Sequence, residues 1–196
     1  MSVLTNFFDY HDVYIETGLG HGQTLAKAIA HGFLELHVIE IDQKLIDMAN
    51  EKFSGFPGVP LTIHHGSSPD VLPEIIDPKR QTLFWLDAHY SAGLYTSDSE
   101  RDRDQLDPRH GECPLLAELK VIAFTPWTLD PIILIDDAVC FTAKDYKAYY
   151  TSWDRSQHPM LDQIKAAILL FSLGNFSVEI RDDGTGEYLV CQRRIQ

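Results

Sequence analysis

Short apolar runs alternate with amphipathic segments along the chain, and the two patterns predict different elements. Runs rich in β-branched and aromatic residues predict buried strands at 13–17, 36–41, 61–65, 81–86 and 131–135. The intervening segments predict helices at 23–30, from an N-cap at Asp42 to about 53, after the GSSP turn at 66–69, and at 112–124. Strands that alternate with helices favour an α/β fold with a parallel sheet and helices on both faces.

The C-terminal third ends the pattern differently. A helix is predicted at 159–173, and strands at 176–181 and 187–193 are joined by DDGTG, which indicates a hairpin. The complete sheet then has seven strands, of which the last is antiparallel. With 196 residues, 44% of them hydrophobic, and neither repeat nor linker, we expect a single domain over 1–196.

Two further segments indicate how helices pack against the sheet. Leu115, Leu116, Leu119 and Ile122 have the spacing of a core-facing stripe. The aromatic segment 141–153 either packs a helix on the sheet or walls an acceptor pocket.

A glycine loop links the first strand to the first helix. Gly18, Gly20 and Gly22 would let backbone amides approach a ligand, as at nucleotide sites where a strand leads into a helix. The dinucleotide pattern G-x-G-x-x-G would put its third glycine at Gln23, and Glu16 beside the loop would repel a pyrophosphate but could receive an ammonium group. A turn that only allows close helix packing is the alternative.

Acidic residues end the second, fourth and fifth predicted strands. Glu40 is placed to hold ribose hydroxyls, unless it is a solvated charge at the strand end. Asp87, Asp136 and Asp137 would meet at one sheet edge, where three carboxylates repel each other strongly. A divalent cation such as Mg²⁺ would remove that conflict, whereas solvated strand ends would need none.

Several of these motifs occur in the order of a known family. ETGLGHG resembles motif I of class I S-adenosylmethionine-dependent methyltransferases, and GSSPDVLPEI resembles a stretch of catechol and caffeoyl-CoA O-methyltransferases. Together with VIEID, FWLDAHY and ILIDDA, they make residues 13–139 similar to the metal-dependent O-methyltransferases of that class. The resemblance implies a Rossmann-like class I methyltransferase fold and methyl transfer to a hydroxyl.

The resemblance also implies roles for individual residues. S-adenosylmethionine would be bound by Glu16, Gly18, Gly20, Gly22, Glu40, Ser68 and Asp87. Mg²⁺ would be held by Asp87, Asp136 and Asp137. Ser68 would contact adenine, although capping of the next helix by Ser67 or Ser68 would also explain that motif.

Two residues depart from the catechol-type pattern. Asp137 stands where that group has an amide, which is more like the macrocin O-methyltransferase and cephalosporin hydroxylase branch. Tyr90 stands where that group has a lysine base, so we predict His89 as the base, because imidazole titrates near neutrality and can accept a hydroxyl proton. A structural role beside the metal, or metal ligation, is the alternative for His89.

The segment 91–111 is polar and without periodicity, and we predict that it forms a lid over the substrate. Its residues available to contact an acceptor are Arg101, Arg103, Arg109 and His110. A disordered, solvated insertion is the alternative.

Charge and composition limit the partners. A net charge of −13 opposes binding to nucleic acid or an anionic membrane. The N-terminus has no signal-peptide pattern, no apolar run could span a membrane, and three scattered cysteines suit a reducing compartment. We therefore expect a cytoplasmic enzyme with a small-molecule acceptor, and leave a homo-oligomer open. A metal-independent N- or C-methyltransferase and a non-catalytic S-adenosylmethionine or nucleotide-binding module are the competing hypotheses.

Overall fold

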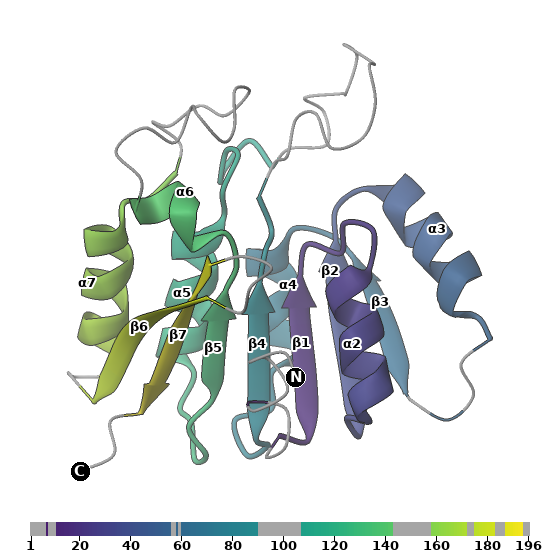
Figure 1. Cartoon of the computed structure of the whole chain (residues 1–196), viewed down its shortest axis with the longest axis horizontal. Coiled ribbons are helices and arrows are strands. Elements are labelled where there is room, and N and C mark those ends of the chain that lie inside the picture. Colours follow the sequence, from purple (N-terminus) through teal and green to yellow (C-terminus); the bar gives the residue numbers. More distant parts are fainter. Residues whose placement is uncertain are drawn as a thin grey trace.

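Seven strands form one sheet in the order β3-β2-β1-β4-β5-β7-β6 (Figure 1). The computed structural model describes residues 7, 11–55, 58, 60–89, 107–142, 158–171, 175–182 and 187–193. The strands are β1 (Val13–Thr17), β2 (Glu35–Glu40), β3 (Leu61–His65), β4 (Thr82–Leu86), β5 (Ile132–Ile135), β6 (Phe176–Asp182) and β7 (Glu187–Arg193). Strand β7 is antiparallel to β5 and β6, whereas β1 to β5 are mutually parallel. The predicted α/β sheet with an antiparallel last strand is confirmed.

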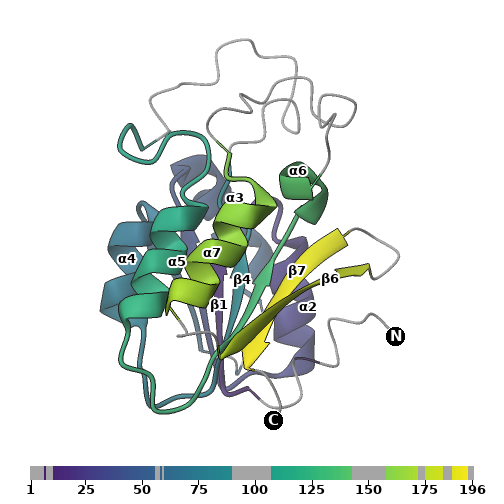
Figure 2. The same ribbon diagram turned by 90° about the vertical axis from the view of Figure 1, so that its left-hand side faces the viewer.

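Helices cover both faces of this sheet (Figure 2). One core packs α2 (Gln23–His31) and α3 (Gln43–Phe53) against β1 and its neighbours. The other core packs α4 (Ser68–Ile75), α5 (Leu115–Phe124), α6 (Ala138–Thr142) and α7 (Leu161–Phe171) against the opposite face. Strand β1 contributes Tyr14 to the first core and Ile15 to the second, as the two-residue period of a strand requires.

Most local predictions are confirmed, and the exceptions have simple causes. The carboxylate of Asp42 accepts a hydrogen bond from the Lys44 amide, so α3 begins with the predicted cap. Helix α5 begins at Leu115 rather than at residue 112, because Pro114 occupies the cap position. Leu116 was predicted as part of the core stripe, but it is 39% exposed; Glu118 lies on the buried face instead.

The predicted aromatic segment is only partly described. Phe141, at its beginning, belongs to α6 and is buried in the same core as residues of α7, which favours the packing role. Residues 143–153 lie outside the described residues. None of the helices in the described ranges is long and apolar enough to cross a bilayer.

The carboxyl ends of three neighbouring strands meet at one edge. Thr17, the last residue of β1, is in register with Leu86 of β4, which is in register with Ile135 of β5. The ladder continues past the strands, because the Asp87 amide donates to Thr17 O and the Asp136 amide donates to Leu86 O. This edge is where ligands bind in open α/β sheets.

Candidate functional site

The glycine loop lies directly against the end of β4. Gly18, Gly20 and Gly22 all have left-handed backbones, with φ of 78°, 50° and 66°. A Cβ on Gly18 would lie 2.4 Å from the carbonyl oxygen of Asp87, closer than real Cβ atoms approach. Glycine is therefore needed at position 18, because the loop touches the backbone of Asp87. The loop predicted to bind the cofactor thus adjoins the strand end predicted to bind the metal.

Glu40 fastens this loop to the end of β2. Its side chain is 7% exposed and accepts hydrogen bonds from the amides of Leu19, Ile41 and Asp42 at 2.8–2.9 Å. Burial raises the pKa of Glu40, and the amide hydrogen bonds oppose that shift. Glu40 is thus no solvated strand-end charge, and its contact with ribose hydroxyls stays a prediction.

Glu16 is buried beside the loop, with 2% of its surface exposed. Tyr14 donates its hydroxyl to the Glu16 carboxylate at 3.0 Å. Burial, against the opposing effect of the Tyr14 hydrogen bond and with the help of the negative charges of Asp136 and Glu40, raises the pKa of Glu16 to about 8. An ammonium group bound here, as the sequence predicts, would shift Glu16 back towards its ionised form.

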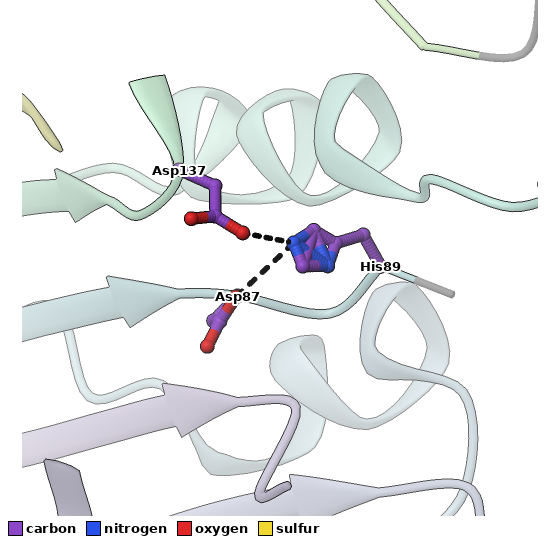
Figure 3. Close-up of side chains that lie close together, drawn as sticks. All are labelled: Asp87, His89 and Asp137. Carbon is purple, nitrogen blue, oxygen red and sulfur yellow. Dashed lines mark hydrogen bonds and ion pairs between the residues drawn. The ribbon is translucent and has the colours of Figure 1, made fainter. Parts of the chain in front are cut away.

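Beside the loop, two carboxylates and one imidazole converge (Figure 3). Nε2 of His89 lies 3.0 Å from Oδ2 of Asp137 and 3.5 Å from Oδ1 of Asp87. One ligand atom from each residue can be chosen so that all three lie within 4.8 Å of one another. The side chains of Asp87 and Asp137 are 28% and 30% exposed, and that of His89 is 9% exposed. The arrangement can hold a cation and still be reached by another molecule.

The grouping differs from the predicted trio in one member. Among the residues that the structure describes, Asp136 is not part of this cluster. Its Oδ1 accepts from the Asp137 amide at 2.7 Å, and its charge acts on Tyr14 and Glu16. Asp137 has a left-handed φ of 51°, which Asp tolerates better than most residues. Asp136 is therefore outside this group of ligand atoms although its charge also acts on Asp87, and metal ligation by Asp136 stays a prediction.

The surroundings of the cluster favour the neutral forms of Asp87 and His89 when no cation is bound. Burial raises the pKa of Asp87, and the nearby Asp136 and Asp137 charges raise it further. Burial, and to a smaller extent the charge of His158, lowers the pKa of His89 to about 3. A divalent cation would favour ionised Asp87 while leaving His89 neutral.

Comparison with known proteins identifies the fold. No protein-family model matches the chain, and no curated protein matches it. Solved structures do match it. One is an O-methyltransferase family protein from Burkholderia thailandensis, at 16% identity and TM-score 0.56, which covers 95% of this chain and 52% of that one. A second is a methyltransferase from Streptococcus mutans in complex with SAH, with 13% identity, TM-score 0.57 and coverage of 98% and 93%. A third is an rRNA-methylase from Clostridium thermocellum, with 16% identity, TM-score 0.58 and coverage of 100% and 98%.

The chain has the class I methyltransferase fold. At these identities the likeness establishes the fold and not the reaction. The chain also spans only about half of the Burkholderia protein, so that protein's activity is not transferred.

Within the methyltransferase fold, Ser68 is held by a residue that the sequence analysis missed. Its hydroxyl donates to Glu118 of α5, and both side chains are buried, at 5% and 1% exposure. Burial raises the pKa of Glu118 to about 7, and the hydrogen bond from Ser68 opposes that shift. The signal was available: Glu118 interrupts the apolar face that includes Leu115, Leu119 and Ile122. Adenine contact by Ser68 stays a prediction.

Of the predicted lid, only residues 107–111 are described. Arg109 forms ion pairs with Asp107 and with Asp70 of α4, so within the described residues it holds the chain onto α4. His110 Nε2 lies 3.9 Å from Asp107. Arg101 and Arg103 lie outside the described residues, and the lid stays a prediction.

A hollow is present beside the glycine loop of the methyltransferase fold. A cavity of about 320 Å³ lies between the loop and α3. Its described lining includes Gly20, His21, Leu45, Met48 and Lys52, and none of the cluster residues. The loop is therefore accessible from the α3 side as well as adjacent to the cluster.

Proposed function

We propose that this protein transfers the methyl group of S-adenosylmethionine to a hydroxyl of a small-molecule acceptor, with a divalent metal bound at the sheet edge. One observation carries the proposal: the cluster of Asp87, His89 and Asp137 directly adjoins the glycine loop, since Gly18 packs on the Asp87 carbonyl. A cation and a sulfonium cofactor could therefore be held side by side. The methyltransferase fold of the chain is consistent with this proposal.

The chain's own residues supply binding and orientation. The loop Gly18 to Gly22 and the buried Glu16 and Glu40 would receive the cofactor, and Ser68 would contact its adenine. Asp87 and Asp137 would hold the metal, which lowers the pKa of a hydroxyl that reaches it. When bound, the cofactor would supply the methyl group to the acceptor oxygen and leave as S-adenosylhomocysteine, and the hydroxyl proton would pass to a proton acceptor, for which His89 and solvent water are the two candidates. Alignment of the two reactants supplies much of the acceleration.

The net charge of −13 favours a small acceptor over RNA, although one similar structure is an rRNA-methylase. An RNA-binding surface needs clustered cationic side chains to replace the counterions of the phosphates. We therefore propose a free hydroxylated metabolite as the acceptor class.

Calorimetry and an acceptor screen test the proposal. We expect S-adenosylmethionine and S-adenosylhomocysteine to bind to the purified protein and NAD not to bind. A screen of hydroxylated acceptors with methyl-labelled cofactor should give label transfer that stops after exhaustive chelation and returns with added divalent metal. Transfer that survives chelation undiminished would favour a metal-independent methyltransferase, and cofactor binding without any transfer would favour a binding module.

A further inference from the structure

Nε2 of His89 points at two carboxylates. It lies near an oxygen of Asp87, which follows β4, and near an oxygen of Asp137, which follows β5 (Figure 3). A general base must instead present a nitrogen to the acceptor. The other nitrogen, Nδ1, is shielded from solvent. Of the two ring nitrogens, Nε2 is therefore the one that faces the carboxylates of the cluster.

The separations between these atoms are those of ligands around one ion. With metal–ligand bonds of about 2.1 Å, two ligands at right angles lie about 3.0 Å apart, and two at a tetrahedral angle about 3.4 Å apart. The observed separations from Nε2 are 3.0 Å and 3.5 Å. The imidazole nitrogen thus has the spacing of a fellow ligand from each carboxylate, and one atom of each of the three groups lies within 4.8 Å of the others.

We infer that His89 is a metal ligand rather than the catalytic base, and that the donor set of one imidazole and two carboxylates selects a first-row transition metal over Mg²⁺. This inference rests on the proposed function and specifies its metal. Mg²⁺ prefers oxygen ligands and keeps its waters, whereas imidazole nitrogen suits transition metals. The partly exposed carboxylates leave coordination positions open towards solvent, where an acceptor could enter. The acceptor proton would then pass to water instead of to His89.

Metal binding without cofactor or acceptor tests this inference separately from methyl transfer. Mn²⁺ is the probe, because free Mn²⁺ is counted by its electron paramagnetic resonance signal. We expect one Mn²⁺ per chain, bound at least tenfold more tightly than Mg²⁺ in competition. Equal affinity for the two ions, or no binding of Mn²⁺, would overturn the inference.

The identity of the ligand is read from the unmodified protein, so the test does not depend on a variant that folds. Electron spin echo modulation of bound Mn²⁺ should show a coupled ¹⁴N nucleus, replaced by ¹⁵N coupling after labelling with ¹⁵N-histidine. Bound Mn²⁺ without nitrogen coupling would mean a shell of oxygen ligands only and would refute ligation by His89.

Variants then assign the nitrogen to one residue. His89→Ala should weaken Mn²⁺ binding at least tenfold and abolish the nitrogen coupling. His31→Ala is the matched control, because His31 ends α2 at the opposite edge of the sheet and should change neither. Asp136→Asn removes a nearby charge but not the imidazole, so it should weaken Mn²⁺ binding less than His89→Ala does and should keep the nitrogen coupling. A loss with Asp136→Asn as large as with His89→Ala would restore the trio of Asp87, Asp136 and Asp137. Failure to find methyl transfer would leave these metal-binding results unaffected.

Discussion

At the scale of single residues, the site depends on two unusual backbone positions. Gly18 has a left-handed φ where the loop touches the Asp87 carbonyl, and Asp137 has one directly after β5. The Asp137 carboxylate and that of Asp87 both contact Nε2 of His89. A residue other than glycine with a left-handed backbone, as Asp137 is, is uncommon, and such residues cluster at functional sites.

Replacement of Gly18 by alanine tests how closely the loop must approach β4. The new methyl carbon would lie 2.4 Å from a backbone oxygen that cannot rotate away, so the loop or β4 must move. We expect Gly18→Ala to lower the free energy of unfolding by about 2 kcal/mol or more and to weaken S-adenosylmethionine binding at least tenfold. Urea unfolding and calorimetry measure the two effects.

The control for that substitution is Gly32→Ala. Gly32 also has a left-handed backbone, with φ of 95°, but its added Cβ would meet nothing within 4 Å. Gly32→Ala should lower the free energy of unfolding by about 1 kcal/mol and leave cofactor binding unchanged. If both variants lose the same free energy of unfolding, the left-handed backbone alone, and not the contact with Asp87, explains the need for glycine.

The sequence predicted which strand ends meet at the site, but it did not predict the contacts that the individual side chains make there. Strand order along the chain was enough to bring Asp87 and Asp137 to one edge, because parallel strands end together. No local pattern specifies that Asp137, and not its neighbour Asp136, joins Asp87 and His89 in the cluster. His89 was singled out from its position near Asp87, but its contact with Asp137 comes from the tertiary fold.

At the scale of elements, a buried hydrogen bond joins α4 to α5. Ser68 at the start of α4 donates to Glu118, which lies one turn into α5 among apolar residues. Hydrophobic periodicity located both helices, but it treats each charged residue as outward-facing. A charged residue spaced like its apolar neighbours, as Glu118 is, indicates a buried polar contact, and its partner is visible only once α4 and α5 are packed.

Two substitutions at Glu118 separate the hydrogen bond from the charge. Glu118→Ala leaves the Ser68 hydroxyl without this acceptor and opens a cavity, so it should cost about 2 to 4 kcal/mol in urea unfolding at pH 7. Glu118→Gln keeps the shape and an acceptor oxygen and should cost about 1 kcal/mol or less. If glutamine is as damaging as alanine, the ionised carboxylate itself is required.

At the scale of the whole molecule, the chain buries acids although it already carries a net charge of −13. Glu16, Glu40 and Glu118 are each less than 10% exposed, and burial raises the pKa of all three. The sequence predicted the sheet and both helical layers, since these follow from periodicity. It did not predict that these acids are buried, because burial depends on which layer covers each strand end.

Because the pKa of Glu16 is raised in the folded protein, Glu16 should make the protein less stable as pH rises. Its pKa is about 8 in the folded protein, against 4.5 as the ordinary value. Between these values the folded state binds a proton that the unfolded state has released, so stability falls as pH rises. Its contribution is fully present below about pH 4.5 and is lost as pH rises through about 8.

Comparison with Glu16→Gln isolates that contribution, because the variant cannot titrate at this position. Other groups act oppositely: burial lowers the pKa of His64, which favours stability at higher pH. Such background terms are shared by both proteins and cancel in the difference. From pH 5.5 to 8.5, in the presence of a chelator, the wild-type protein should lose on the order of 3 kcal/mol relative to the variant. A constant difference across that range would show that Glu16 is ionised in the folded protein, as an acid ready to receive an ammonium group would be.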